Sequence, residues 1–192
     1  MTNYSKTLLY KKVISVTDMS AASLEKLFNS IVVLKVKKKE NILKEGQVCK
    51  GIYFVESGYL RLFAHKDGLE INTGFIFEND FATNLKSLRS GVAADTTIQA
   101  GEDAVLYLFE KNTLLELYKG SPEIGSFGRL LLEQLLMAQE EHANLFKLFT
   151  PAERYNYLQT NHPQLLQRVS LSQIASYLGV ARETLSRLRK IK

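Results

Sequence analysis

The residues with the most chemical potential lie near the end of the chain, in the stretch Arg-Glu-Thr-Leu-Ser-Arg at 182–187. On a helix, its polar side chains share one face about 140° wide with Lys190. The members of that face are Arg182, Glu183, Ser186, Arg187 and Lys190. Leu185 and Leu188 fall opposite, so leucines are expected to anchor the helix. An arginine fork fits guanine O6 and N7, and a glutamate accepts from cytosine N4. These residue types at this spacing could therefore read base edges in a DNA major groove.

Glu183 separates two interpretations of this face. A protein that only neutralises phosphates would gain by losing a carboxylate among arginines, so Glu183 favours base reading. The alternative is a solvated helix in which Glu183 pairs with Arg187 at the i, i+4 spacing.

The charge distribution favours a nucleic-acid partner for this end of the chain. The net charge is +5. Residues 151–192 carry all of it, while the first 150 residues sum to zero. Lysines and arginines near phosphates release condensed counterions, which favours binding. The alternative is a solvated basic tail.

Two short helices joined by a tight turn are predicted over 170–192. Ser170 and Gln173 have the spacing of a capping box. Gly179 is expected to leave the first helix in the left-handed conformation, and Val180 to fill the corner. The residues expected to face inward are Ile174, Ala175 and Leu178. A second capping box, from Thr150 to Glu153, predicts another helix from there to about residue 159, before Asn161-His162-Pro163 breaks the chain.

Upstream of these helices, residues 31–109 have the spacing of an all-β domain. Short apolar or alternating runs predict strands at 32–38, 52–56, 59–65, 70–77, 96–100 and 104–109. Turns at 57–58, 66–68 and 101–103 hold Gly and Asp, which tolerate the positive φ of hairpins. Antiparallel hairpins closing as a barrel or a sandwich follow, preceded by a helix over 18–30. That helix would bury Leu24, Leu27, Phe28 and Ile31.

Between these regions, residues 122–149 have a helical period. Ser121 can cap this helix, and Pro122 suits its first position. The apolar stripe comprises Ile124, Phe127, Leu131, Leu135, Ala138, His142, Leu145 and Phe149. A helix about 40 Å long outruns the β domain, so a second copy of the chain is the expected cover for the stripe. The expected dimer contacts are Phe127, Leu131, Leu135, Ala138, His142 and Leu145. The alternative is burial against the chain's own β domain.

The order of β domain, long helix and paired helices, with "RETLSR" in the last helix, resembles the Crp/Fnr superfamily of bacterial transcription regulators. The stretch "LKEGQVCKGIYFVESGYLRLF" is similar to that family's β-roll motif, around Gly46, Tyr53, Val55 and Gly58. The resemblance implies an α+β fold in three parts. An antiparallel, jelly-roll-like β-roll of the cyclic nucleotide-binding type spans 1–120, a dimerisation helix 121–149, and a helix-turn-helix domain 150–192. It implies that Arg182, Glu183, Ser186 and Arg187 read bases, with Thr184 and Ser170 contacting phosphates.

The cyclic nucleotide-binding residues of that roll do not match this chain. Where relatives hold the ribose with Gly-Glu and the cyclic phosphate with Arg-Ser, this sequence has Thr83-Asn84 and Ala94-Asp95. A carboxylate at the position of the cyclic phosphate opposes binding of that phosphate. Cyclic AMP is therefore not expected to bind, and no cofactor is expected. Arg89 or Lys86 could stand in if the loop were shifted. Thr83, Asn84, Ala94, Asp95 and Arg89 therefore form the candidate effector pocket, for a different effector or none.

Other departures narrow the function further. The single cysteine, Cys49, excludes a protein-borne iron–sulfur cluster within one chain. Ala181 stands where the last helix would favour a capping Ser or Thr, at a cost of about 1 kcal/mol. Relatives often add a β-hairpin wing after this helix, whereas this sequence stops at Lys192, so the wing is either absent or cut off.

The expected function is a dimeric, sequence-specific transcription regulator. Its expected partners are a near-palindromic double-stranded DNA site and a second copy of the chain, with RNA polymerase as a further candidate. The sequence lacks a secretory start or a long apolar run, so a cytoplasmic protein without membrane contact is expected. One alternative is a β-roll module that binds a small molecule or protein and does not act through DNA. A cupin-like enzyme is not expected, because His65, His142 and His162 lie in three different segments.

Overall fold

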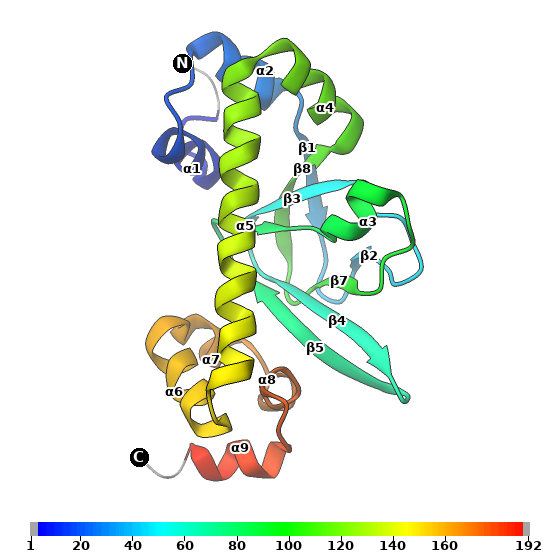
Figure 1. Ribbon diagram of the computed structural model, residues 1–192, viewed down its shortest axis with the longest axis vertical. Helices are drawn as coiled ribbons and strands as arrows, with labels where there is room; N and C mark the ends of the chain where they lie inside the picture. The colour runs from blue at the N-terminus through cyan, green and yellow to red at the C-terminus, as the bar shows by residue number, and fades with distance from the viewer. Residues whose placement is uncertain (1–3, 190–192) are drawn as a thin grey trace.

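The computed structural model of this protein describes residues 4–189 and is built around one long helix, α5 (Figure 1). A β-roll lies beside the middle of α5, the helices α1, α2 and α4 lie at one end, and the C-terminal helices lie at the other. The strands are β1 (Val32–Val36), β2 (Asn41–Leu43), β3 (Gly51–Ser57), β4 (Leu60–Lys66), β5 (Leu69–Ile76), β6 (Phe81–Ala82), β7 (Thr97–Ala100) and β8 (Ala104–Glu110). The helices are α1 (Leu8–Val16), α2 (Ala21–Asn29), α3 (Leu85–Ser90), α4 (Lys111–Gly120), α5 (Pro122–Leu148), α6 (Pro151–Asn161), α7 (Pro163–Arg168), α8 (Leu171–Leu178) and α9 (Arg182–Leu188).

The roll consists of two antiparallel sheets, with strand orders β1-β8-β3-β6 and β2-β7-β4-β5. Alternating side chains of both sheets point into a shared core, and Phe54, Leu60, Ile98 and Leu106 are fully buried there. This arrangement confirms the predicted fold class: an antiparallel β-roll followed by helices. The predicted strands all form, and their ends agree with the sequence to within about two residues, the usual ambiguity of such boundaries.

Short elements escaped the sequence analysis. These are α1, α3, α4, α7 and the strands β2 and β6. Strands of two or three residues and a helix of six residues show no usable hydrophobic period. The helix expected from residue 18 instead begins at Ala21, because the Ser20 side chain accepts the Ser23 N–H and caps it there.

The turns of the roll follow the sequence with one exception. Gly58, Asp67 and Gly68 have positive φ values of 84°, 52° and 77°, as the hairpin turns require. Gly101 is not among the glycines with positive φ in residues 4–189. The expectation that glycine is needed there for a positive φ was therefore wrong. Gly101 instead lies against the ring of Tyr59, and a Cβ there would collide with that ring. Glycine is needed at 101 for a close approach rather than for a left-handed turn.

The inner face of α5 is covered by the chain itself, in its first half by α1, α2, α4 and the roll. Ile124, Phe127 and Leu131 belong to the main core, and Leu135 packs at its edge. Leu145 is also buried, with 4% of its surface exposed. Burial against the chain's own β domain, the alternative, therefore describes this face from Ile124 to Leu135. Phe127, Leu131 and Leu145 are covered by their own chain. From the sequence, a second copy of the chain was expected to cover them.

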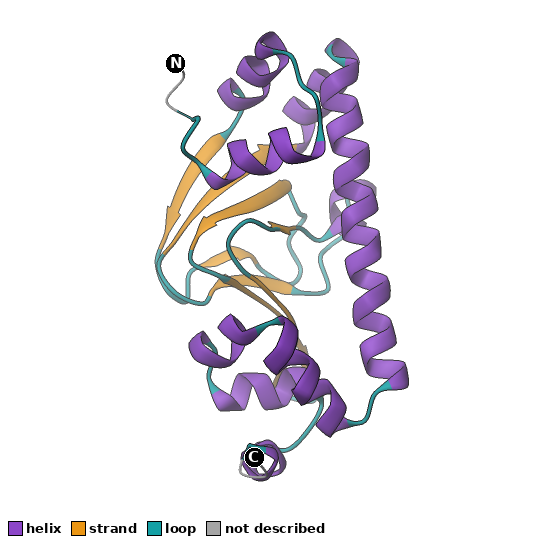
Figure 2. Cartoon of the chain, turned by 90° about the vertical axis from the view of Figure 1, so that its left-hand side faces the viewer, coloured by secondary structure: helices purple, strands orange, loops and turns teal. Residues whose placement is uncertain are grey.

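The C-terminal helices form a second, smaller core beneath the roll (Figure 2). The predicted capping box at the start of α6 is present: the Thr150 side chain accepts from the Glu153 N–H, and the Glu153 side chain accepts from the Thr150 N–H. The break expected at 161–163 occurs, but Pro163 immediately starts the additional helix α7. Both cores meet at β5, against which α8 packs.

Candidate nucleic-acid interface

The helices α8 and α9 are joined by the tight turn that the sequence predicts. Gly179 has φ 69° and ψ 34°, the left-handed conformation that ends α8. The Val180 N–H donates to the Ala175 carbonyl at 3.0 Å, which closes the turn. Ile174, Ala175 and Leu178 are buried as expected, with 3%, 2% and 0% of their surfaces exposed. The predicted helix-turn-helix geometry is confirmed.

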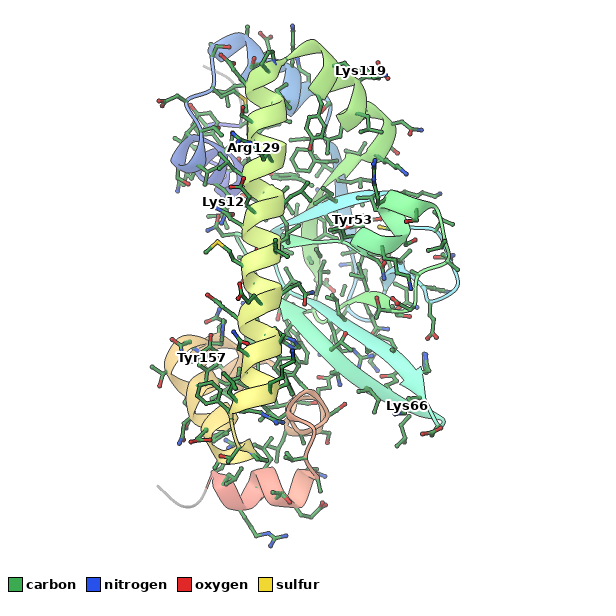
Figure 3. All side chains as sticks on the ribbon, viewed as in Figure 1. Lys12, Tyr53, Lys66, Lys119, Arg129 and Tyr157 are labelled. Carbon is green, nitrogen blue, oxygen red and sulfur yellow. The ribbon has the colours of Figure 1, made fainter. Side chains whose placement is uncertain are left out.

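The helix α9 presents its polar side chains to solvent while Leu185 anchors it. Leu185 is completely buried in the C-terminal core, and Leu188 packs partly against it. Arg182, Glu183 and Arg187 are exposed, and Thr184 and Ser186 are half-buried. Figure 3 shows side chains of α9 projecting away from the body of the molecule. Lys190, expected on the same face, lies outside the described residues.

A shallow groove of about 330 Å³ runs along this face. It is lined by Leu171, Arg182, Glu183, Ser186 and Arg187. Within residues 4–189 no ion pair joins Glu183 to Arg187, although their spacing would permit one. The carboxylate and the guanidinium groups therefore face outward unpaired with each other, in a hollow that a base-pair edge could approach.

The start of α8 lies beside this groove. Ser170 is exposed and caps α8, its Oγ accepting from the Gln173 N–H at 3.3 Å. The Gln173 side chain accepts from the Ser170 hydroxyl at 3.0 Å. Ala181 occupies the N-cap of α9 and makes no side-chain cap, as expected.

Arg154 attaches the C-terminal helices to the end of α5, and the sequence analysis did not identify this role. Its guanidinium donates to the carbonyls of Phe146, Phe149 and Leu178 at 3.0, 3.0 and 3.1 Å. It also lies over the Phe146 ring, 4.7 Å from the ring centroid. The carbonyls at the ends of α5 and α8 have no partner within their own helices, so one arginine satisfies two helix ends. The only sequence signal was an arginine just after a capping box.

His142 packs at the same junction, between Phe146 and Tyr177, with ring centroids 4.8 and 5.6 Å away. Its Nε2 is buried and has no hydrogen-bond partner. Burial lowers the pKa of His142, which keeps the ring neutral at pH 7. His142 thus contacts its own chain's α8.

The outer face of α5 carries exposed apolar side chains. Leu132, Leu136 and Met137 expose 45%, 71% and 62% of their surfaces. In Figure 2, one side of α5 forms the right-hand edge of the molecule, and none of the other described elements lies beyond it. Ala138, expected in the apolar stripe, is also exposed.

The candidate effector residues engage one another. The Asn84 side chain accepts from the Ser87 N–H at 3.0 Å and caps α3. Its Nδ2 donates to Asp95 Oδ1 at 2.9 Å and to Thr96 Oγ1 at 3.0 Å. This bond from Asn84 lowers the pKa of the Asp95 carboxyl, which holds it charged at pH 7.

Of the remaining residues of that region, Ala94 and Thr83 are bonded within the roll, whereas Arg89 is exposed. Ala94 is 3% exposed, and its backbone pairs with Gly46 and Gln47 at 2.8 Å each. The Thr83 hydroxyl donates to the Gly51 carbonyl at 3.0 Å. Lys86 Nζ lies 3.8 Å from the Asp95 carboxylate. Arg89 is exposed on the last turn of α3.

One hollow of the roll involves residues that sequence reasoning missed. It encloses about 350 Å³ and is lined by Ile42, Leu43, Gln47, Val48, Lys50 and Tyr53. Ile42 and Leu43 lie in β2, a strand too short to predict, and Gln47, Val48 and Lys50 lie in the loop that follows it.

Two further properties concern the described part of the chain. Across residues 4–189, no helix is both long and apolar enough to span a bilayer. Within the same range, no cluster of three or more His, Cys, Asp or Glu side chains is suited to hold a metal ion.

The comparison with known families and proteins gives one family match. Residues 33–121 match the cyclic nucleotide-binding domain family, which covers the roll and α4. Among curated protein sequences, none matches this chain.

Solved structures with the same fold include several regulators. FixK2 from Bradyrhizobium japonicum is 22% identical with a TM-score of 0.71, over 84% of this chain and 83% of that one. A putative transcriptional regulator of the Crp/Fnr family from Eubacterium rectale is 19% identical, with a TM-score of 0.67 over 91% and 83%. The c-di-GMP responsive global regulator CLP from Xanthomonas campestris is 20% identical, with a TM-score of 0.66 over 90% and 91%.

Proposed function

Because this chain contains a β-roll of the cyclic nucleotide-binding type and has the fold of the Crp/Fnr regulators, we propose that it is a sequence-specific DNA-binding transcription regulator. The observation that carries the proposal is the outer face of α9. There, two arginines, a glutamate and a serine line a groove on a helix that a fully buried leucine holds in place. Arg182 and Arg187 are suited to guanine, and Glu183 to cytosine.

Selection of bound duplexes from a random pool tests this function. The full chain is expected to enrich a two-fold symmetric consensus whose half-sites lie about 34 Å apart, one helical turn. Its affinity should fall steeply as salt rises, because bound phosphates release counterions. Failure to enrich any sequence at low salt would contradict the proposal and favour a roll that binds a small molecule or a protein without DNA.

We further propose that the regulator is a dimer joined through the outer face of α5. Leu132, Leu136 and Met137 make up the exposed apolar part of that face. A second copy is the suitable cover, because a two-fold axis along α5 would bury both copies of this face and place two α9 helices at the same end of the dimer.

Sedimentation tests the dimer. Leu136→Asp places a charge in the proposed seam and is expected to shift the protein from dimer to monomer. Leu115→Asp on α4 is a matched control, because Leu115 is also exposed, at 42%, but lies off α5. Equal dissociation of both variants, or of neither, would place the dimer contact elsewhere.

The roll is proposed to work without a cyclic nucleotide. Asp95 puts a negative charge where the resemblance would place the cyclic phosphate, and Asn84 is committed to α3, Asp95 and Thr96. Calorimetric titration with cyclic AMP is expected to show no binding. Saturable binding at micromolar concentration would contradict this.

A further inference from the structure

The C-terminal helices dock onto the edge of the roll. The strand β5 is an edge strand, so its outward backbone groups have no strand partner. The Asn72 N–H donates to Ser176 Oγ at 3.0 Å, and the Ser176 hydroxyl donates to the Glu70 carbonyl at 3.2 Å. Tyr177 packs edge-on against Phe75, 5.6 Å between centroids. One turn of α8 therefore completes the open edge of the sheet.

A second contact lies beside this edge, where Arg168 enters a socket on the roll. Its guanidinium donates to both carboxylate oxygens of Glu78, at 2.7 and 2.8 Å, and to Glu102 at 2.5 Å. It also lies over the rings of Tyr59 and Phe77, 5.4 and 5.2 Å from their centroids. Paired hydrogen bonds from one planar fork fix orientation as well as distance.

The socket is held in shape by the roll itself. Glu78 Oε1 also accepts from the Gly58 N–H at 2.9 Å, which ties the carboxylate to the neighbouring turn. Gly101 gives the Tyr59 ring room to lie flat at the base. Turns from three parts of the sequence converge there, and each carries one element of the socket. Apart from Arg168, the socket is thus made of residues of the roll.

Arg168 is close in sequence to the DNA-reading helices. It ends α7 and lies two residues before Ser170, the cap of α8. The helices α8 and α9 share one core, so an orientation imposed on α8 is passed to α9. The α9 face stays exposed in this docked arrangement, so the contact orients the reading helix and does not cover it.

We propose that Arg168 is a positioning residue whose insertion between Glu78 and Glu102 fixes α9 relative to the roll and α5, and so makes the dimer selective for the spacing between half-sites. This inference rests on the proposed function. In a two-fold dimer, both α9 helices reach their grooves together only if each has a fixed orientation. If the C-terminal helices were not docked on the roll, α9 would still read its half-site, but the dimer would tolerate an altered spacing between half-sites.

The variant Glu78→Gln gives the sharpest test, because docking and simple electrostatics predict opposite results. Removing a carboxylate makes the protein more positive, which alone would tighten DNA binding. If the socket positions α9, affinity for the full site should instead fall by about tenfold. The second α9 helix of the dimer would no longer be held at its half-site, so its effective concentration there would fall. Glu25→Gln on α2 makes the same charge change on an exposed residue far from the socket and serves as the control.

The full reading uses duplexes with the selected half-sites at several spacings. Two extra base pairs rotate the second half-site by about 70°, at about 10.5 base pairs per turn. The wild type and Glu25→Gln should lose about tenfold or more on that duplex, and Glu78→Gln less than about threefold. A duplex with a single half-site should bind all three proteins within about twofold. Unchanged spacing selectivity in Glu78→Gln would overturn the proposal, whereas loss of half-site binding by the wild type would overturn the proposed function instead.

A measurement without DNA tests the positioning role of Arg168 independently of the proposed function. The Asn72 amide donates across the docking contact, so its hydrogen exchange reports docking directly. Its exchange is expected to be slow in the wild type and at least about tenfold faster in Glu78→Gln, while the amides of β4 stay protected. Equal Asn72 protection in both proteins would show that Arg168 does not control docking.

Discussion

The helix α9 and the start of α3 both carry polar side chains at positions where the family resemblance places ligand contacts, yet the chain uses them in opposite ways. At α3, Asn84 and Asp95 bond to each other and to neighbouring groups. On α9, Arg182 and Glu183 face solvent beside an open groove. Polar groups that bond within their own fold stabilise the chain, while polar groups without such bonds are available to a partner. Mutations at the two places should therefore affect different measurements.

The largest effect is expected on α9. Arg187→Ala should weaken binding to the selected DNA by about 1–3 kcal/mol, because one base-reading fork is lost. Thermal stability should stay unchanged, since Arg187 is exposed. A gel shift against selected and random duplexes measures both affinities. Lys26→Ala, on the far side of the molecule, is the control, and an equal loss on both duplexes would assign Arg187 to phosphate contact.

Arg154 belongs with the groups that bond within the fold, although it lies in the same basic segment as α9. Arg154→Met should lower the free energy of unfolding by about 2 kcal/mol, because three carbonyls at helix ends lose a charged donor. Urea denaturation measures this. Arg182→Met, which changes the same side-chain type on an exposed helix position, should change the free energy by less than about 0.5 kcal/mol. Comparable losses would mean that α9 also uses its arginines internally.

Asn84→Ala should cost about 1 kcal/mol of stability, the usual loss when a helix N-cap is removed. Glu183→Ala should cost less than half of that, because no bond within residues 4–189 uses its carboxylate. The same denaturation experiment compares them. A neutral Asn84→Ala would contradict the structural role assigned to Asn84 at the start of α3.

The smallest effect is expected from pH at the Arg168 socket. The hydrogen bond from Arg168 lowers the pKa of Glu78 below its ordinary value of 4.5. The pairing therefore contributes fully above about pH 5 and is lost as the pH falls through the lowered pKa. The stability difference between wild type and Glu78→Gln should be constant from pH 7 to about pH 5 and shrink below that, by less than about 1 kcal/mol because the pair is partly solvated. A difference that grew on acidification would contradict the assigned sign.

The sequence predicted most of the fold because its main elements are specified locally. The capping residues Thr150 and Ser170 begin their helices where expected, and Gly179 ends α8 in the left-handed conformation. Leu185 was placed correctly in the core by helical period alone. Elements too short to show a period, such as β6 and α3, were missed.

The candidate DNA-reading face could be predicted from the sequence for the same reason. With 3.6 residues per turn, the sequence alone determines which side chains share a helix face, whatever the helix packs against. The sequence did not predict which apolar face of α5 packs against the roll. The stripe from Phe127 to Leu145 was a clear helical pattern, but periodicity does not say which surface covers it. The structure buries Phe127, Leu131 and Leu145 in their own chain and leaves Leu132 and Leu136 outside.

By itself, then, the sequence determined the elements, their caps and the polar face of α9, because these depend on residues within one or two turns of each other. The roles of the arginines, in contrast, depend on contacts that form only when the chain folds. Arg154, Arg168 and Arg187 are the same residue type in one basic segment, yet one satisfies helix carbonyls, one enters a carboxylate socket and one faces solvent. Their partners come from residues as far as 90 positions away in the chain, and only folding brings those together.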